Sequence, residues 1–240
     1  MIVSFVQTKG GTGKSTLSLN LAFSKVIQKN FESVALIEFD PQGTLRDWWS
    51  EREENQRKST NISFHHISST QKAVVQDGIK SIAQHNELLI LDTPGESTGK
   101  LHTKLACAIS DLVVIPTRSS TNEEMALANK LLPILKEITR LNNHKKGTFQ
   151  VLPAFVNTRS KKEKIQKYFE EILPSYIGCF PNVYPLRSIY ENFNREGMTL
   201  LEYAKMVKNN QRLYRQTLKS IDDIEQIASS ILRFLITRKS

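Results

Sequence analysis

Short apolar runs alternate with longer stretches of helical periodicity along most of this sequence. Runs of strand length are found at 2–7, 33–39, 61–65, 87–91, 112–115 and 150–156. Apolar positions recur every three to four residues at 15–29, 44–56, 70–84, 98–109, 121–141, 160–172 and 210–236. Strands that alternate with helices predict parallel pairing through crossover helices. Continuous apolar runs such as Leu88–Leu91 fit strands that are covered on both faces.

The pattern predicts an α/β fold, with a mostly parallel, doubly wound sheet and helices on both faces. A chain of 240 residues that is 39% hydrophobic can bury one substantial core, and no Pro/Gly-rich linker divides it. We therefore expect a single domain over residues 1–240. Cys107 and Cys179 are far apart and lack CxxC spacing, so we expect two reduced core thiols.

Charge and apolar content narrow the class of protein. No apolar run approaches the roughly 18 residues of a membrane-spanning helix, and the N-terminal residues lack the features of a signal peptide. We therefore expect a cytoplasmic location. The chain has 33 Lys and Arg against 24 Asp and Glu, a net charge of +9. This excess favours a polyanionic partner but does not identify it.

The first apolar run leads directly into a glycine-rich loop, residues 9–16, with the sequence KGGTGKST. A strand, a loop with little side-chain bulk and a helix in succession bring backbone N–H groups to a phosphate. In the general motif GxxxxGK[ST], Lys14 reaches the β and γ phosphates of ATP and the Ser15 hydroxyl coordinates Mg²⁺. The predicted nucleotide-binding residues are Gly10, Gly11, Thr12, Gly13, Lys14, Ser15 and Thr16. The competing Rossmann interpretation lacks GxGxxG and leaves Lys14 unexplained.

The loop departs from the general motif at its start. Thr8 replaces the first glycine, and an early lysine, Lys9, produces the pattern KGGxGK[ST]. This pattern resembles the deviant P-loop of the ParA/MinD ATPase family. The resemblance implies that Lys9 crosses a nucleotide-sandwich homodimer and neutralises charge on the partner's ATP, as an arginine finger does. Lys9 and Lys14 are therefore both candidate catalytic residues.

Two carboxylates follow later strands of the predicted sheet. The run that ends at Phe39 is followed by DPQG, which begins at Asp40, and the run that ends at Leu91 is followed by DTPG, which begins at Asp92. Both acids are expected at the sheet edge where open α/β sheets bind ligands. By resemblance, Asp40 is catalytic and serves the hydrolytic water, and the Mg²⁺ site comprises Ser15, Asp40 and Asp92. The family's usual DxDPQ is altered here, because Glu38 replaces the first aspartate.

Further segments extend the resemblance over most of the chain. Asn157 is similar to the asparagine that contacts adenine in relatives, where an amide can pair with the base edge; a simple turn is the alternative. DPQ followed by Trp48 or Trp49 favours the ParA branch. That branch binds nonspecific double-stranded DNA as ATP dimers and is released when a ParB-like or adaptor protein stimulates hydrolysis. The resemblance thus implies a nucleoid-associated ATPase that moves plasmids, chromosomes or protein cargo.

A basic run near the C-terminus independently suggests DNA. Its cations are spaced 3, 4, 3 and 4 residues apart with no acid between them: Lys205, Lys208, Arg212, Arg215 and Lys219. On one continuous helix they would form a single stripe, which self-repulsion disfavours unless a polyanion binds. The core-facing side is assigned to Leu213, Leu218, Ile221 and Ile224. An ordinary solubilising surface is the alternative.

Two other functions share the same ATPase site. The amphipathic segment 227–239 suggests a MinD-like membrane anchor, although a terminal helix packed on the core is simpler and a membrane partner is not expected. The basic C-terminal helix also resembles that of the accessory ATPase of conjugative or T-DNA transfer. The iron-protein branch is disfavoured, because neither cysteine lies in its cluster-ligand segments.

Overall fold

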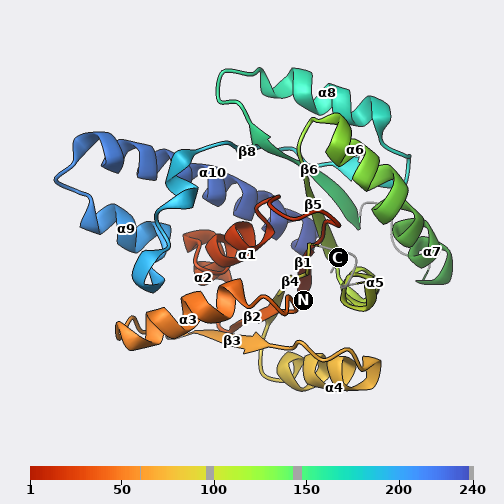
Figure 1. Cartoon of the computed structure of the whole chain (residues 1–240), viewed down its shortest axis with the longest axis horizontal. Coiled ribbons are helices and arrows are strands. Elements are labelled where there is room, and N and C mark those ends of the chain that lie inside the picture. The colour runs from red at the N-terminus through yellow and green to blue at the C-terminus, as the bar shows by residue number, and fades with distance from the viewer. Residues whose placement is uncertain (60, 96–99, 143–147, 238–240) are drawn as a thin grey trace.

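The computed structural model describes residues 1–59, 61–95, 100–142 and 148–237. Its centre is an all-parallel sheet in the order β3-β2-β4-β1-β5-β6-β7, with β8 paired to β6 (Figure 1). The strands are β1 (Ile2–Phe5), β2 (Val34–Glu38), β3 (Ile62–His66), β4 (Leu88–Asp92), β5 (Leu112–Thr117), β6 (Phe149–Val156), β7 (Ile177–Cys179) and β8 (Tyr184–Pro185). The first six confirm the predicted runs. The last two escaped prediction because they are too short to carry a pattern.

Helices connect the strands much as the periodicity predicts. They are α1 (Lys14–Ala22), α2 (Lys25–Asn30), α3 (Thr44–Glu54), α4 (Lys72–Ala83), α5 (Lys100–Ile109), α6 (Thr121–Ala126), α7 (Leu132–Asn142), α8 (Lys162–Ile172), α9 (Leu200–Met206) and α10 (Gln211–Ile236). The expected helix over 15–29 is divided, because the Ser24 side chain accepts from the Ile27 N–H and caps α2. A π-helical turn, η2 (Leu127–Leu131), joins α6 to α7. Two 3₁₀ turns, η3 (Ser188–Glu191) and η4 (Arg195–Gly197), precede α9.

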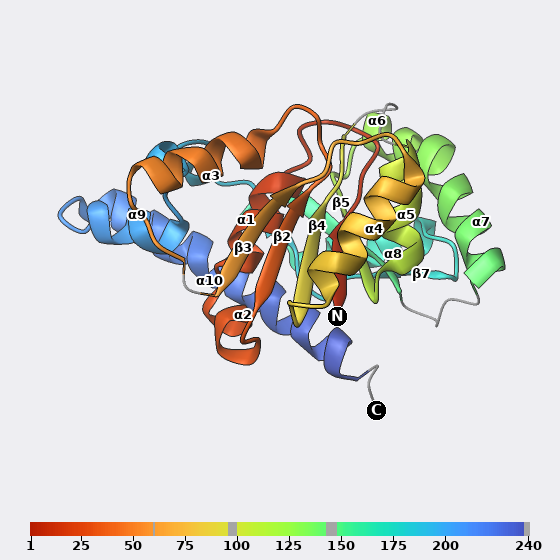
Figure 2. The ribbon, with the colours of Figure 1, turned by 90° about the horizontal axis from the view of Figure 1, so that it is seen from below.

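Apolar side chains cover both faces of the sheet, as predicted for a doubly wound fold. Alternate residues of β2 point to opposite faces: Leu36 belongs to the core cluster that includes residues of α1, α3 and α10, whereas Ile37 belongs to the cluster that includes residues of α4, α5 and α7. Figure 2 shows α1 and α10 on one side of the sheet and α4 and α5 on the other. The carboxyl ends of β1, β2 and β4 are left free by this arrangement.

The last helix, α10, packs on the core along its C-terminal half. Its buried residues there include Ile224, Ile227 and Ile231, and the Glu225 carboxylate accepts from the first N–H groups of α2 at 2.7 and 3.0 Å. Ile224 confirms its predicted core-facing role. The same prediction is wrong for Leu218, which is 43% exposed, because Thr217 and Ser220 occupy the buried side of α10 at this point.

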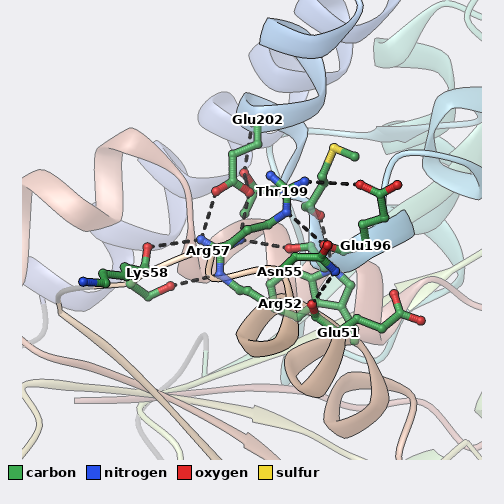
Figure 3. A network of polar contacts seen from close by, with 12 residues as sticks. Glu51, Arg52, Asn55, Arg57, Lys58, Glu196, Thr199 and Glu202 are labelled. Carbon is green, nitrogen blue, oxygen red and sulfur yellow. Dashed lines mark hydrogen bonds and ion pairs between the residues drawn. The ribbon is translucent and has the colours of Figure 1, made fainter.

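A buried arginine ties this projecting part to α3 (Figure 3). The Arg52 guanidinium donates to both carboxylate oxygens of Glu202 at 2.8 and 3.0 Å and to the Gly197 carbonyl at 2.9 Å. It also lies 4.8 Å from the Phe23 ring centroid. Glu202 completes a capping box with Thr199 at the start of α9. The network therefore fixes α9 to the helix that follows the Asp40 loop.

Candidate functional site

A cavity of about 690 Å³ opens at the carboxyl ends of β1, β2 and β4. Crevices at this edge are the usual ligand sites of open α/β sheets. Its lining comes from five segments: 10–16, 40–44, 94–95, Phe155 and 184–191. The cavity therefore has one end formed by the glycine-rich loop and another formed by residues that lie late in the chain.

The glycine-rich loop forms the first end, with α1 starting at Lys14. No side chain among the described residues caps α1, so its first N–H groups and the positive end of its dipole are available to an anion. The Lys14 side chain is buried beside Gly95. A Cβ atom added to Gly95 would lie 3.2 Å from Lys14 Nζ. Burial lowers the pKa of Lys14, while Asp92, Asp40 and Glu123 oppose that shift. These groups suit a phosphate chain.

A hydroxyl and a carboxylate meet beneath this loop. Ser15 Oγ donates to Asp92 Oδ2 at 2.6 Å, and Ser18 Oγ donates to Asp92 Oδ1 at 3.2 Å. Asp92 is fully buried, and burial raises its pKa to about 7 against the opposing effects of Ser15 and Lys14. Hydroxyl and carboxylate oxygens are the ligands that Mg²⁺ prefers, together with phosphate oxygens. The donor set therefore fits Mg²⁺.

Glu38, the departure from the family pattern, has a structural explanation. Its buried carboxylate accepts from the Leu45 and Arg46 N–H groups at 2.9 and 3.0 Å, at the start of α3. Gly43, the N-cap residue of α3, has no side chain that could cap the helix. The Glu38 carboxylate takes this role and also complements the helix dipole. Burial raises the pKa of Glu38 against these two bonds. Glu38 thereby anchors one end of the Asp40 loop.

Asp40 lies half-buried at the cavity edge. Its Oδ1 accepts from the Gln42 N–H at 3.0 Å, and its carbonyl oxygen lies 3.0 Å from His66 Nε2. Asp40, Lys14, Ser15 and Thr16 all line the same cavity, whereas Asp92 lies beneath it. The structure thus brings the predicted phosphate, metal and water residues together.

Aromatic side chains form the second end of the cavity. A bulge in β6 places Phe155 at φ +52°, and its ring lies against Gly13 together with that of Tyr184. A Cβ on Gly13, where φ is +81°, would lie 3.0 and 3.1 Å from the two rings. Arg118 stacks 4.0 Å from the Phe155 centroid and donates to the Gly11 carbonyl at 2.9 Å. The rings therefore press directly on the glycine-rich loop.

This aromatic end was not predicted. Phe155, Tyr184 and Tyr190 belong to no motif that predicts a site. Arg187 was not predicted as a site residue either. The available signal was the concentration of aromatic residues at 184–193, close to a strand too short to recognise. Two hydroxyls on the cavity wall, those of Thr12 and Tyr184, are buried and lack hydrogen-bond partners within the described residues.

Besides Asp92, which lies beneath the cavity, two predicted nucleotide-site residues are outside its lining. Lys9 is half-buried beside α6, where it lines a shallow hollow with Asn122, Met125 and Lys130. Asn157 occupies the exposed turn after β6, and its Oδ1 accepts from the Arg159 N–H at 2.9 Å. Neither lines the cavity. The roles of Lys9 in a second copy and of Asn157 at adenine stay predictions.

The five predicted DNA-binding cations are exposed, but they do not lie on one helix. Lys205 belongs to α9, Lys208 to the turn that follows, and the other three to α10. The expectation of one continuous stripe is therefore wrong, because α9 ends at Met206 and the Asn210 side chain caps a new helix. Within the described part of the chain none of the five forms an ion pair. Figure 1 shows α9 and the first half of α10 as a projecting hairpin.

The alternative membrane function is not favoured by α10. The face that it would insert includes Ile227, Ile231 and Leu235, which are all buried on the sheet. Arg238 and Lys239, the basic end of that segment, lie outside the described residues. A search of the described helices finds none that is long and apolar enough to cross a bilayer.

Comparison with known proteins agrees with the fold and the glycine-rich loop. The family model described as "CobQ/CobB/MinD/ParA nucleotide binding domain" matches residues 3–238. A curated relative, the maintenance of carboxysome distribution protein A of Gloeobacter kilaueensis, is 22% identical over 222 residues, which cover 92% of this chain and 94% of that protein.

Solved structures share the architecture at lower sequence identity. The McdA–ATP complex from Cyanothece is 15% identical and superimposes with a TM-score of 0.67, over 96% of this chain and 95% of that one. The MinD cell division protein of Aquifex aeolicus is also 15% identical, with a TM-score of 0.63 over 96% of both chains. These likenesses show the fold.

Proposed function

Because the chain belongs to the CobQ/CobB/MinD/ParA nucleotide-binding family, we propose that it is a ParA-type ATPase that positions cargo on DNA. In this proposal it binds Mg·ATP, forms a homodimer, binds nonspecific double-stranded DNA and hydrolyses ATP when a ParB-like or adaptor protein stimulates it. The observation that carries the ATPase assignment is the pairing of Ser15 with Asp92 beneath a loop that also buries Lys14. The location that follows is cytoplasmic, on the nucleoid in the ATP state.

The residues of the loop divide the binding work. Backbone N–H groups from Gly10 to Thr16 surround the phosphates, and the Lys14 ammonium offsets their charge in a site with little water. Ser15, Asp40 and Asp92 would hold Mg²⁺. When bound, the ion neutralises charge on the β and γ phosphates. The unpartnered Thr12 hydroxyl is a further donor at the phosphate end.

Hydrolysis requires a positioned water and a stabilised phosphoryl group. Asp40 orients the water from the loop between β2 and α3, which Glu38 and His66 hold in place. Lys9 lies beside α6 and does not line the cavity of its own chain. This position suits contact with a nucleotide bound by a second chain. Asn157 is one candidate for the adenine edge, and the aromatic end of the cavity offers a stacking surface.

The dimer role of Lys9 has a direct test. Lys9→Ala should keep nucleotide affinity within about twofold but remove ATP-dependent dimerisation, because its partner lies on another chain. Light scattering after size exclusion, with ATP, ADP and no nucleotide, measures the mass. The exposed Lys29→Ala is a matched control. A Lys9→Ala protein that dimerises normally with ATP would contradict the role in the second chain.

The projecting hairpin is the proposed DNA surface. Its cations are exposed and lie on two helices and the turn between them, so they can follow a phosphate backbone better than a straight stripe. The residues are Lys205, Lys208, Arg212, Arg215 and Lys219. Phosphate contacts without base contacts give affinity that depends on salt and little on sequence.

The test of the whole proposal is fluorescence anisotropy on two unrelated duplexes with ATP, ADP or no nucleotide over a salt series. We expect similar affinity for both duplexes and the highest affinity with ATP. Replacing both Arg212 and Arg215 with Ala should lower the slope of log K against log salt by roughly 2, since each phosphate contact contributes about 0.9. DNA affinity that is unchanged at low salt would refute the hairpin as the binding surface.

An accessory ATPase of conjugative or T-DNA-type transfer is the second candidate, favoured by the same basic helix. It uses the same nucleotide site, so the protein's chemistry does not separate the two. A neighbouring gene for a centromere-binding protein would support partition, whereas relaxase or secretion genes would support transfer.

A further inference from the structure

The aromatic end of the cavity is bonded to the helix that carries three of the proposed DNA-binding cations. The Arg187 guanidinium pairs through Nε with Asp223 Oδ2, and these side chains are only 20% and 13% exposed. The Tyr190 hydroxyl donates to the Ser220 carbonyl at 3.3 Å. Arg187 and Tyr190 both line the cavity, and Ser220 and Asp223 lie one and four residues after Lys219 on α10. A ligand that engages this wall therefore acts on α10.

A second donor for Asp223 lies in the same cluster. Tyr184 is fully buried on the cavity wall, with its ring centroid 4.9 Å from that of Tyr190, and its hydroxyl has no hydrogen-bond partner among the described residues. β8, which carries Tyr184, lies against α10, and the neighbouring Tyr190 reaches Ser220, three residues before Asp223. Burial raises the pKa of Tyr184, and the charges of Tyr190 and Asp223 act in the same direction. Leaving a buried hydroxyl unpaired is unfavourable, so the protein gains when Tyr184 finds an acceptor.

We propose that Arg187 is a nucleotide-positioning residue that exchanges partners: it leaves Asp223 when nucleotide fills the cavity, and the Tyr184 hydroxyl then donates to Asp223. The inference rests on the proposed function in that the ligand is a nucleotide. A guanidinium on the cavity wall can donate to ribose or base acceptors at the end away from the phosphates. The exchange avoids the large penalty of leaving the Asp223 carboxylate buried and alone.

The exchange gives the cluster two arrangements, in which Asp223 of α10 is paired with different side chains. Without nucleotide, Asp223 is paired with Arg187, in the segment that leads into η3. With nucleotide, it is paired with Tyr184 on β8, while the Tyr190 bond to Ser220 stays in place. Occupancy of the cavity is thereby reported to the segment of α10 next to Lys219 within a single chain. This regulation precedes, and does not require, the arrival of a second copy.

The exchange predicts opposite effects of two conservative substitutions on nucleotide affinity. Tyr184→Phe removes the donor of the bound arrangement, so Mg·ADP binding should weaken roughly fivefold. Asp223→Asn weakens the pair that competes for Arg187 but keeps an acceptor for Tyr184, so binding should tighten roughly threefold to tenfold. Isothermal titration with Mg·ADP in the absence of DNA measures both. Tyr176→Phe, a partly buried tyrosine on the far side of the sheet, is the matched control and should bind as wild type does.

A purely structural role for the cluster predicts the reverse pattern. Tyr184→Phe would then leave Mg·ADP affinity unchanged, because the hydroxyl has no hydrogen-bond partner among the residues that the structure describes. Asp223→Asn would weaken binding through lost stability. Either result overturns the exchange. Should Asp223→Asn fail to fold, Tyr184→Phe decides alone, since the thermal midpoint of that variant should be at or above that of the wild type.

Hydrogen exchange of the wild type gives an independent view of α10. Mg·ADP should change exchange of the amides around 220–223 by more than it changes those around 227–235, and no difference would overturn the link. Failure of the proposed function is distinguishable from failure of the exchange. A wild type that does not bind Mg·ADP removes both, whereas normal binding by wild type and Tyr184→Phe alike removes only the exchange.

Discussion

At the phosphate end of the cavity the walls are backbone and short side chains from one continuous segment, residues 10–16, together with the end of β4. The opposite end is made of large side chains, Phe155 from β6 and Tyr184, Arg187 and Tyr190 from a later segment. The first end is held by local contacts such as the Ser15–Asp92 bond. The second is held by α10, through Asp223 and Ser220.

This difference separates two tasks within one cavity. Backbone N–H groups and a buried lysine provide the same chemistry to any nucleotide, because they address the phosphates that all nucleotides share. Large side chains in contact with a distant helix can differ between relatives. They can also transmit to that helix whether a nucleotide is bound. Substitutions at the two ends should therefore differ in kind: those at the first end remove binding and hydrolysis, and those at the second end change affinity and its effect on α10.

The largest effect is expected at the phosphate end. Lys14→Ala removes the buried cation of the loop, so nucleotide affinity should fall on the order of 100-fold, and hydrolysis by at least as much. Titration with a fluorescent ADP analogue and a phosphate-release assay measure the two quantities, with Lys29→Ala as the control. A Lys14→Ala protein that retains wild-type affinity would mean that the cavity is not a phosphate site.

Gly13 is the point where the two ends touch. Gly13→Ala places a Cβ at φ +81° and 3.0 to 3.1 Å from two rings, so we expect a loss of about 2–3 kcal/mol of unfolding free energy. Urea denaturation of the variant and of the neighbouring Thr16→Ala measures the difference. Equal stability of the two variants would show that the rings do not constrain the loop.

A stability change outside the cavity provides a reference for these effects. Glu202→Gln removes the charge that pairs with buried Arg52 and should cost about 2 kcal/mol at neutral pH. Burial alone would raise the pKa of Glu202, but bonds from Arg52 and Thr199 outweigh it, so the pKa is lowered. The stabilisation is therefore present above the ordinary glutamate pKa and is lost as pH falls through the lowered one.

Unfolding of wild type and Glu202→Gln should accordingly differ at pH 7 and converge in acid. Nucleotide affinity of the folded variant should stay at the wild-type value, since no cavity contact changes. A variant that loses affinity in proportion to its stability would mean that the two ends of the cavity respond to global stability and not to their own contacts.

The smallest effect is expected from Phe155→Leu at the aromatic end. The substitution removes a ring that stacks with Arg118 and faces Gly13, so nucleotide affinity should fall by about 1 kcal/mol, with little change in the hydrolysis rate of the bound complex. Single-turnover kinetics separate the two quantities. In the double variant with Gly13→Ala, the loss of unfolding free energy should be smaller than the sum of the losses of the two single variants. The smaller side chain at position 155 makes room for the new methyl group.

The phosphate end was predictable because its information is local. A seven-residue pattern after a strand fixes which groups meet a phosphate, and the continuous apolar runs fix the parallel sheet that places Asp40 and Asp92 nearby. The role of Glu38 was not predictable, since it depends on where α3 begins relative to β2. The break in the basic stripe was missed because the helical spacing of the cations continues across Asn210, whose side chain caps a new helix.

The aromatic end escaped prediction for a different reason. Its residues meet only through tertiary contacts: Phe155 depends on a bulge in β6, and Tyr184 lies on a strand of two residues. Neither feature has a periodic signature, because each interrupts regular structure. The pairing of Arg187 with Asp223 joins residues that no spacing rule relates. Aromatic residues in such segments look like core until the fold shows which hollow they face.

The position of β1 in the sheet sets an order for biosynthesis. β1 precedes β4 and β5 in the chain but lies between them in the sheet, so it completes its pairing only after both have emerged from the ribosome. The wall formed by 184–190 and the basic hairpin follow when most of the chain has been made. A nascent chain therefore carries its phosphate loop long before the other half of the cavity exists. The proposed nucleotide site and the proposed DNA surface are therefore completed at nearly the same point of synthesis.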